Sequence, residues 1–238
     1  GEEIVDNFKR EAMQLPILIE HLLNDSIYIS SNITFKNLSP LSTFLGKPGS
    51  SDKGGMNFKE YLIRQRKHRQ AEISATIDTQ LFAQKASEIY GYNHFVSDTS
   101  GSLCEIVDPD NPNDKVLKSM QKSTLPVWIK GASDQTAELH RRFIKSPKPM
   151  FYNEGFLRNK WTEYCKNKNQ APKDVNPDEF MSYGFKELIL HRIPIYSKIA
   201  EHWGITIEIS DIKKYSSPNE FIELIGEAID RKTKNTGS

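Results

Sequence analysis

The sequence predicts an α/β fold in which a parallel sheet is flanked by helices. Three short apolar segments bounded by turn residues are expected to be strands, at residues 95–97, 125–130 and 204–209. Between them lie segments whose apolar residues recur at helical spacing. Strands that alternate with helices are typical of parallel sheets, and the crossover connections between such strands are right-handed.

Prolines and polar turns divide the expected helices. Pro16 splits the first helical stretch, and the long basic helix that begins at Phe58 is divided near Asp78. The segment 45–55 is rich in glycine and charged residues and is expected to be a mobile surface loop. The helical segments expected from apolar periodicity are 3–24, 58–90, 136–144, 153–202 with a break at 169–177, and 220–231.

Composition and charge indicate a soluble, somewhat polar globular chain. Its 238 residues suffice for one large domain, or for one domain with a helical appendage. The formal net charge of +1 gives no support to a general nucleic-acid or membrane-surface role. No secretory signal or apolar run of membrane-spanning length is present in the sequence. Cys104 and Cys165 lack CxxC spacing, which indicates reduced thiols and a cytoplasmic protein.

The most informative segment runs from Asn93 to Ser102, where a short apolar stretch enters a hydroxyl-rich turn that contains a glycine. Ligands bind at the carboxyl edge of open α/β sheets, and such a turn would lie there. In one interpretation Asp98 binds a hydroxyl or a hydrated Mg²⁺, and the amides of Thr99, Ser100, Gly101 and Ser102 bind an anion. In the other, Asp98 or Thr99 is simply a helix N-cap.

A strongly basic helix precedes this turn, with the sequence Arg64-Gln65-Arg66-Lys67-His68-Arg69-Gln70-Ala71-Glu72. Arg69 and Glu72 are three residues apart and therefore share a helix face. Either these charges form weak surface ion pairs, or Glu72 orients Arg69 toward an anionic ligand. The charge pattern alone favours surface ion pairs.

Two later segments could also carry cations to a site. A helix end at His140–Lys145 leads into a basic loop stiffened by Pro147 and Pro149, which could close over phosphates or simply complement the helix dipole. Farther on, Pro194 is expected to interrupt a helix just after Arg192, whose side chain points either inward or into water.

Other kinds of catalytic centre are not indicated by the sequence. The six histidines show no metal-ligand spacing, so no metal site is expected from protein side chains. No G-x-S-x-G elbow is present, which removes the usual start of hydrolase-triad chemistry. Cys104 is interpreted as a small buried hydrophobe rather than a nucleophile.

Taken in order, these segments resemble the small P-loop kinases typified by shikimate kinase and gluconate kinase. Arg69-Gln70-Ala71-Glu72 is similar to their Arg-x-x-Glu helix, and Asp98-Thr99-Ser100-Gly101-Ser102 to their substrate turn. Arg142, Lys148-Pro149-Met150 and Arg192-Ile193-Pro194-Ile195-Tyr196 match the later arginine, the lid and the Arg-x-Pro-Leu-Tyr element. Nearly the whole chain also resembles a group of bacterial proteins labelled simply as ATPases, through residues 6–13, 41–47 and 90–92.

This resemblance implies a single P-loop NTPase domain over residues 1–238, with a helical lid or insertion near 150–190. The implied activity is ATP hydrolysis or ATP-dependent phosphoryl transfer to a small anionic acceptor, with Mg²⁺. The implied roles are catalysis for Asp98 and for Lys148 of the lid, nucleotide contact for Arg142, and acceptor binding for Arg69, Glu72, Thr99, Ser100, Gly101, Ser102 and Arg192.

One feature of the family is missing, namely the phosphate-binding loop G-x-x-x-x-G-K-[ST]. Leu45-Gly46-Lys47-Pro48-Gly49-Ser50 has similar residue types at the wrong spacing, and Pro48 has no amide to offer a phosphate. In family members the loop lies upstream of the segment that matches Gly1. The chain is therefore expected to represent the C-terminal majority of such an enzyme and to bind Mg·ATP poorly alone.

A different class of function remains open at this stage. The chain could be a non-catalytic binding module whose basic helix, Arg64 to Arg69, and glycine-rich loop, 46–55, contact an anionic partner such as RNA or another protein. The missing phosphate-binding loop favours this alternative.

Overall fold

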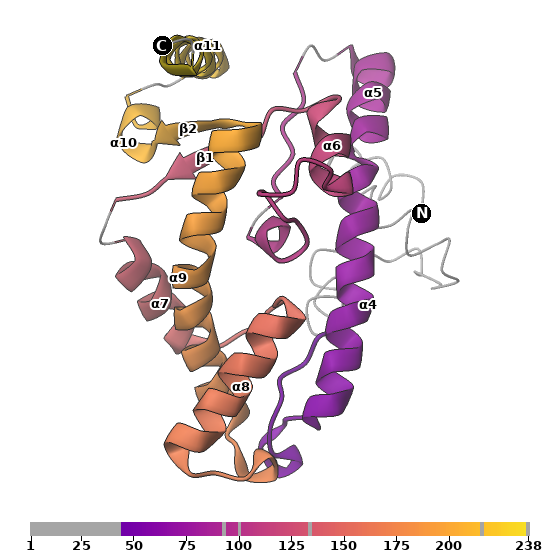
Figure 1. Cartoon of the computed structure of the whole chain (residues 1–238), viewed down its shortest axis with the longest axis vertical. Coiled ribbons are helices and arrows are strands. Elements are labelled where there is room, and N and C mark those ends of the chain that lie inside the picture. The colour runs from indigo at the N-terminus through magenta and orange to yellow at the C-terminus, as the bar shows by residue number, and fades with distance from the viewer. Residues whose placement is uncertain (1–43, 92–93, 100, 133–134, 215–216, 237–238) are drawn as a thin grey trace.

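The computed structural model describes residues 44–91, 94–99, 101–132, 135–214 and 217–236. The helices expected within 3–24, and Asn93 and Ser100 of the turn, lie outside these residues. Figure 1 shows two long helices, α4 (Phe58–Ile77) and α9 (Pro177–Trp203), running along the long axis of the molecule. The remaining helices are α5 (Thr79–Tyr90), α6 (Lys115–Gln121), α7 (Gln135–Lys145), α8 (Glu154–Lys168), α10 (Ile209–Ile212) and α11 (Pro218–Thr236).

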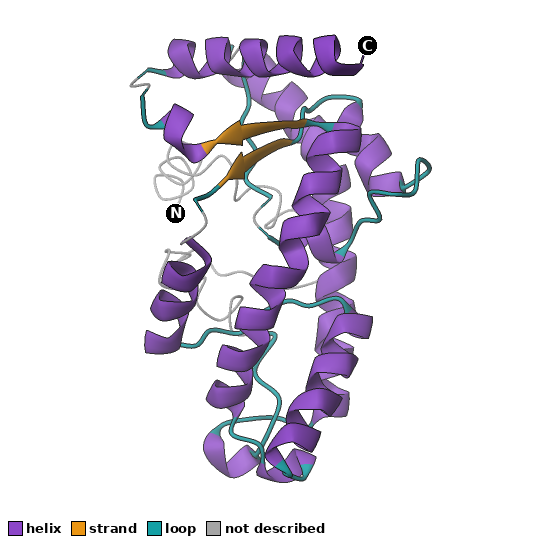
Figure 2. Cartoon of the chain, turned by 60° about the vertical axis from the view of Figure 1, so that its left-hand side comes forward, coloured by secondary structure: helices purple, strands orange, loops and turns teal. Residues whose placement is uncertain are grey.

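The sheet consists of two parallel strands, β1 (Val127–Lys130) and β2 (Ile205–Glu208). They pair from Val127 opposite Ile205 to Lys130 opposite Glu208. Ile205 and Ile207 face α11, where they pack against Leu224 and Ala228. Figure 2 shows α11 crossing one end of the molecule beside both strands. The parallel pairing of these two segments is therefore confirmed, and a mostly helical chain with this small parallel sheet is compatible with the predicted α/β class.

The prediction of a third strand at 95–97 is wrong, because residues 94–99 form no helix or strand. Val96 is 74% exposed, so its side chain lacks the packing surface that a buried strand requires. No described strand lies beside this segment to complete a hydrogen-bond ladder. The described fold is accordingly richer in helix than the alternating pattern predicted.

Most helix limits follow from capping residues in the sequence. Asn57, Asn153 and Asn176 each accept backbone N–H bonds at the start of α4, α8 and α9. Asp78 separates α4 from α5, as predicted. The prediction that Pro194 interrupts a helix is wrong, because α9 continues through this proline. Buried residues before and after the proline, such as Leu188 and Ile199, hold the helix in register.

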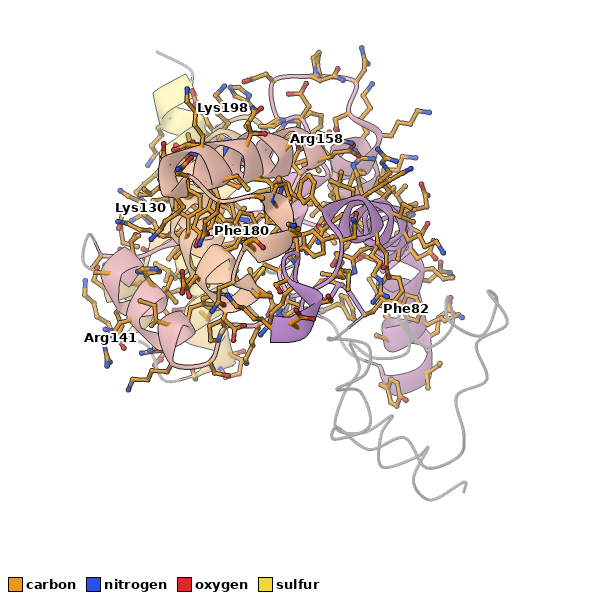
Figure 3. All side chains as sticks on the ribbon, turned by 90° about the horizontal axis from the view of Figure 1, so that it is seen from below. Phe82, Lys130, Arg141, Arg158, Phe180 and Lys198 are labelled. Carbon is orange, nitrogen blue, oxygen red and sulfur yellow. The ribbon has the colours of Figure 1, made fainter. Side chains whose placement is uncertain are left out.

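The helical segment near 150–190 is part of the main core. Leu157 and Trp161 of α8 and Phe180 and Leu188 of α9 pack with Tyr61 of α4 in one buried cluster. Figure 3 shows Phe180 near the middle of the molecule, surrounded by side chains from several elements. None of the helices in the described ranges has the length and apolarity needed to cross a bilayer.

The glycine-rich loop at 45–55 lies at the surface only in part: residues 51–54 are exposed, whereas the residues before them are packed. Pro48, Gly49 and Ser50 are buried, and the Ser50 amide donates to the carbonyl of Val175 before α9. A Cβ on Gly49, whose φ is +140°, would lie 2.5 Å from that same carbonyl oxygen. Lys47 Nζ is 2.6 Å from a carboxylate oxygen of Asp178 in α9. The loop thus fastens the start of α4 to the start of α9.

Gly204, between α9 and β2, provides a test of this packing. A Cβ there would lie 2.0 Å from the carbonyl oxygen of Pro126, a backbone atom at the start of β1. We expect Gly204→Ala to lower the free energy of unfolding by about 1–3 kcal/mol, as overpacking commonly does. The measurement is urea denaturation followed by circular dichroism.

The matched control is Gly226→Ala in α11, where an added Cβ meets no atom within 4 Å. Because alanine favours helix over glycine by about 0.5–1 kcal/mol, this variant is expected to be at least as stable as the parent. Equal stability of the Gly204 variant and the parent would contradict the close approach of the backbones.

Candidate functional site

The centre of the candidate site is a buried ion pair between Glu105 and Arg192. Glu105 belongs to the short 3-10 helix η3 (Ser102–Glu105), and its side chain is 0% exposed. Arg192 lies in α9, and its side chain is 12% exposed. Arg192 Nε donates to Glu105 Oε1 over 2.7 Å, and Nη2 donates to the carbonyl of Phe151 over 3.2 Å. The other oxygen of Glu105 accepts from the Asn153 amide at 2.7 Å.

The sequence prediction left the orientation of Arg192 open, and the structure places it inward. Both charges are removed from water, so each depends on the other and on the backbone groups around them. Their hydrogen bonds join η3, the segment before α8, and the middle of α9. The pair therefore fixes the position of the turn that precedes η3.

Gly101 of that turn is in direct contact with Arg192. A Cβ on Gly101 would lie 2.0 Å from Arg192 Nη1 and 2.9 Å from the hydroxyl of Tyr196. The φ of Gly101 is −79°, which any residue adopts, so the glycine is needed here for space. Arg192 therefore lies beside the turn, as predicted, and its guanidinium contacts the backbone of Gly101.

Ser102, next in the turn, bonds to Glu72 of α4. Its hydroxyl donates to Glu72 Oε2 at 3.0 Å and lies 3.1 Å from the carbonyl of Thr99. Glu72 Oε1 lies 3.0 Å from His68 Nε2, one helical turn earlier. The carboxylate of Glu72 therefore holds the turn against α4.

Arg69 is not oriented by Glu72, in contrast to the prediction. It is exposed, and it makes no hydrogen bond or ion pair with the described residues. The reason is geometric: His68 and Ser102 both lie within reach of the carboxylate and occupy both of its oxygens. Arg69 thus lies on the same helix as the site, without a bond to it.

The other residues of the turn are placed as follows. Asp98 is exposed, whereas Thr99 is half-buried. Gly101 is the N-cap of η3 and no side chain caps that helix, so the expected N-cap role of Asp98 or Thr99 is wrong. What holds the turn in position is instead the contact with Arg192 and the bond to Glu72.

Arg142 and Lys148 lie away from these contacts. Arg142 is in α7, its side chain is 70% exposed, and its Nε donates to Glu138 at 2.7 Å. Its neighbour Arg141, which also bonds Glu138, lies at the outer edge of the molecule in Figure 3. Lys148 is exposed. Among the described residues, no hydrogen bond or ion pair joins either side chain to Arg192 or to the turn.

The chain beyond Lys148 is firmly attached to α4. The carbonyl of Met150 accepts from Tyr61 Oη at 2.9 Å and from Gln65 Nε2 at 3.0 Å. The oxygen of the same Gln65 side chain accepts from the amide of Tyr152. The predicted lid is therefore anchored immediately after its basic-Pro element.

Sequence reasoning missed Glu105 and Tyr196. Glu105 follows Leu103 and Cys104 and precedes Ile106, and a lone acid in such an apolar run is a signal for a buried, paired charge. Burial raises the pKa of the Cys104 thiol and of the neighbouring Tyr196 hydroxyl to about 12. Cys104 is therefore a buried thiol, as predicted, with one polar neighbour.

Within the described ranges, no group of three or more His, Cys, Asp or Glu side chains could hold a metal ion. No protein-family model matches the sequence, and neither a curated protein nor a solved structure shows significant similarity to it. Any function proposed for the site must therefore be argued from its geometry.

Removal of one partner of the ion pair is expected to be costly. Arg192→Ala leaves the Glu105 carboxylate buried without a counter-charge, so we expect it to lower the free energy of unfolding by about 3–5 kcal/mol. Chemical denaturation of the variant and the parent measures the difference.

Two further variants make this measurement specific. Arg142→Ala removes an exposed arginine and should change stability by no more than about 0.5 kcal/mol. The double variant Glu105→Gln/Arg192→Met carries no buried charge and should be more stable than Arg192→Ala. A double variant that is less stable than Arg192→Ala would contradict the buried ion pair.

The environment of Cys104 leads to a chemical prediction. Burial raises its pKa to about 12, so the reactive thiolate is scarce at pH 8. Relative to a free thiol of pKa about 8.5, we expect alkylation by iodoacetamide to be slower by a factor of about 10³ in the folded chain. Mass spectrometry of peptides containing Cys104, with urea-unfolded protein as control, tests this; equal rates in both states would contradict it.

Proposed function

We propose that this chain recognises a small acceptor with an anionic group, in an enzyme that transfers phosphoryl groups from ATP or hydrolyses ATP. The observation that supports the proposal is the meeting of three distant segments at one turn. Glu72 from α4, Gly101 and Ser102 from the turn, and Arg192 from α9 are in contact. The resemblance to small P-loop kinases assigns these positions to acceptor binding.

In this proposal Arg192 serves as an oriented hydrogen-bond donor. Its charge is balanced by Glu105, and its Nε and Nη2 hold Glu105 and Phe151. Nη1 faces the turn at Gly101 and makes no hydrogen bond with the described residues. A guanidinium N–H fixed in this way can bind a carboxylate or phosphate oxygen without first being ordered.

Glu72 and Ser102 complete the acceptor site in this proposal. The Ser102 hydroxyl is held by Glu72, so its oxygen has a fixed direction from which to accept a hydrogen bond from an acceptor hydroxyl. Asp98 and Thr99 lie a few residues upstream and would form the outer part of the same site. Arg69 would reach it only if its exposed side chain reorients toward the turn.

The residues of this sequence do not fit the phosphates of ATP. The glycine-rich loop lacks the required spacing, and the amides of Gly49, Gly55 and Met56 already donate to backbone carbonyls of the loop itself. Lys47 is bound to Asp178. The proposal therefore assigns neither ATP nor Mg²⁺ to this loop, and it limits the roles of these residues to the acceptor.

The alternative of a non-catalytic module that binds an anionic partner gains little support from the basic helix. Arg64 bonds Glu60, and Arg66 forms a bidentate ion pair with Glu154. These contacts neutralise part of the basic surface. Lys67 and Arg69 would remain for such a partner, which is few charges for binding dominated by phosphate contacts.

The proposal is tested by ADP release from Mg·ATP in the protein that contains this chain, with a panel of small carboxylates and phosphate esters as acceptors. Ser102→Ala should raise the acceptor KM by up to about tenfold, because a hydrogen bond between neutral groups contributes about 0.5–1.5 kcal/mol. The KM for ATP should stay nearly unchanged. Ser210→Ala, at an exposed position of α10, is the control.

Two outcomes would count against this reading. Absence of ADP release with every acceptor and without one would contradict the ATP-dependent activity. Release with an acceptor KM that is insensitive to Ser102→Ala would place the acceptor elsewhere. Arg69→Ala decides a narrower question, since an unchanged acceptor KM removes Arg69 from the site.

A further inference from the structure

A groove of about 600 Å³ lies between α8, α9 and the loop that follows η3. Its walls include Phe156 and Asn159 of α8, and His191 and Lys198 of α9. Cys104 and Asn153 form the end nearest to the Glu105–Arg192 pair. In Figure 3 Lys198 and Arg158, which belong to α9 and α8, lie toward the same side of the molecule. The volume lies within the range of small-molecule sites.

The loop that forms one wall, residues 107–110, is held in place by side chains. Asp108 Oδ1 accepts from the Asp110 amide, and Asp114 Oδ2 accepts from the Asp108 amide. The carbonyl of Pro109 accepts from Trp203 of α9 at 3.0 Å. Lys198 bonds Asp110 across the groove mouth. A wall fixed by so many bonds is already in position before a ligand arrives.

The polar groups along the groove suit hydroxyl groups. The side chains of Asn159 and His191 make no hydrogen bond with the part of the chain that the structure describes. In the side chain of Asn153, the oxygen accepts the bonds that cap α8, and the NH2 group makes no bond with the described residues. Asp108 keeps one carboxylate oxygen that the described residues do not use. Amides and carboxylates together can both donate to and accept from hydroxyl groups.

The charge of the groove argues against an anionic ligand. Among the acidic and basic lining residues, Asp108 and Asp110 are acidic and only Lys198 is basic. Lys198 is paired with Asp110 and also interacts with Asp108, so one ammonium group offsets two carboxylates and the groove keeps an excess negative charge. A phosphate or carboxylate placed here would meet that charge at short range.

One wall is aromatic. The rings of Phe156 and His191 are stacked, with centroids 4.5 Å apart and planes inclined by 26°. Together with Pro194 and Ile195 they give the groove an apolar lining beside the acidic loop. A ligand that fits both sides has a flat apolar face and hydroxyl groups on its edge.

We propose that this groove binds an uncharged, polyhydroxylated ring compound, namely a sugar or a nucleoside. The site is separate from the turn at Ser102 and does not depend on the proposed ATP-dependent activity. Sugars and nucleosides share the required chemistry, a ring face for the aromatic wall at His191 and hydroxyl groups for Asp108 and Asn159.

The test is calorimetric titration of this chain with two matched pairs of probes, adenosine with AMP and glucose with glucose 6-phosphate. We expect saturable binding of adenosine, of glucose, or of both, and binding of the phosphorylated partner that is weaker by about tenfold, because of the charge of Asp108. Binding of adenosine alone identifies a nucleoside site, and binding of glucose alone identifies a sugar site.

Two variants locate the binding. Asn159→Ala removes an exposed amide and should weaken binding of the uncharged probe by about tenfold, the effect of one lost hydrogen bond. Asp108→Asn keeps the acceptor for the Asp110 amide and should reduce the difference between each probe and its phosphorylated partner. Asn219→Ala and Asp230→Asn, on exposed positions of α11, are the controls and should change neither quantity.

Three outcomes overturn the proposal: no saturable binding of either uncharged probe below about 10 mM, a level weaker than almost any specific small-molecule site; equal affinity for a probe and its phosphorylated partner; or affinities that neither groove variant changes.

Discussion

The buried pair of Glu105 and Arg192 is the interaction on which the arrangement of the site depends. A carboxylate with no exposed surface needs a counter-charge and hydrogen bonds, and both come from segments distant in the sequence. Arg192 supplies the charge from α9, and the Asn153 amide supplies a further bond from the start of α8. The pair determines how η3, α8 and α9 meet, and hence where the turn before η3 lies.

The same physical requirement recurs elsewhere in the molecule. Irregular segments and helix ends leave backbone groups without partners of their own, and buried or half-buried polar side chains satisfy them here. Gln65 bonds the backbone at Met150 and Tyr152, and Lys232 binds the carbonyls of Ala200, Glu201 and Gly204 at the end of α9. The long helices thus hold the connections between them as well as the core.

Two candidate binding regions lie on either side of Glu105. The turn with Gly101 and Ser102 meets α4 and Arg192, and it is the region for which we propose an anionic ligand. The groove lined by Phe156 and Asn159 lies between α8 and α9, and its acidic loop disfavours an anionic ligand. The two regions therefore differ in the ligand charge that they favour. Because both lie beside the Glu105–Arg192 pair, loss of this pair would displace the turn and the groove.

The sequence alone determined most of the local structure. Apolar periodicity predicted α4, α5, α7, α8, α9 and α11, the division at Asp78 and the two strands that pair in parallel, but it did not predict the short helices α6 and α10. It also predicted that Arg192 lies near the turn at Ser102, and the contact between Gly101 and Arg192 agrees with this prediction. These features depend on neighbouring residues, whose propensities and spacing are visible in the chain itself.

The tertiary structure decided the rest, because partners far apart in sequence compete for the same groups. Glu72 lies within reach of Arg69 along its helix, yet its oxygens bond His68 and Ser102. Val96 has strand propensity but finds no neighbouring strand in the described chain, while Pro194 stays within a helix that is packed on both sides. Which donor reaches a carboxylate, and which segment finds a partner, is set by packing that no local pattern records.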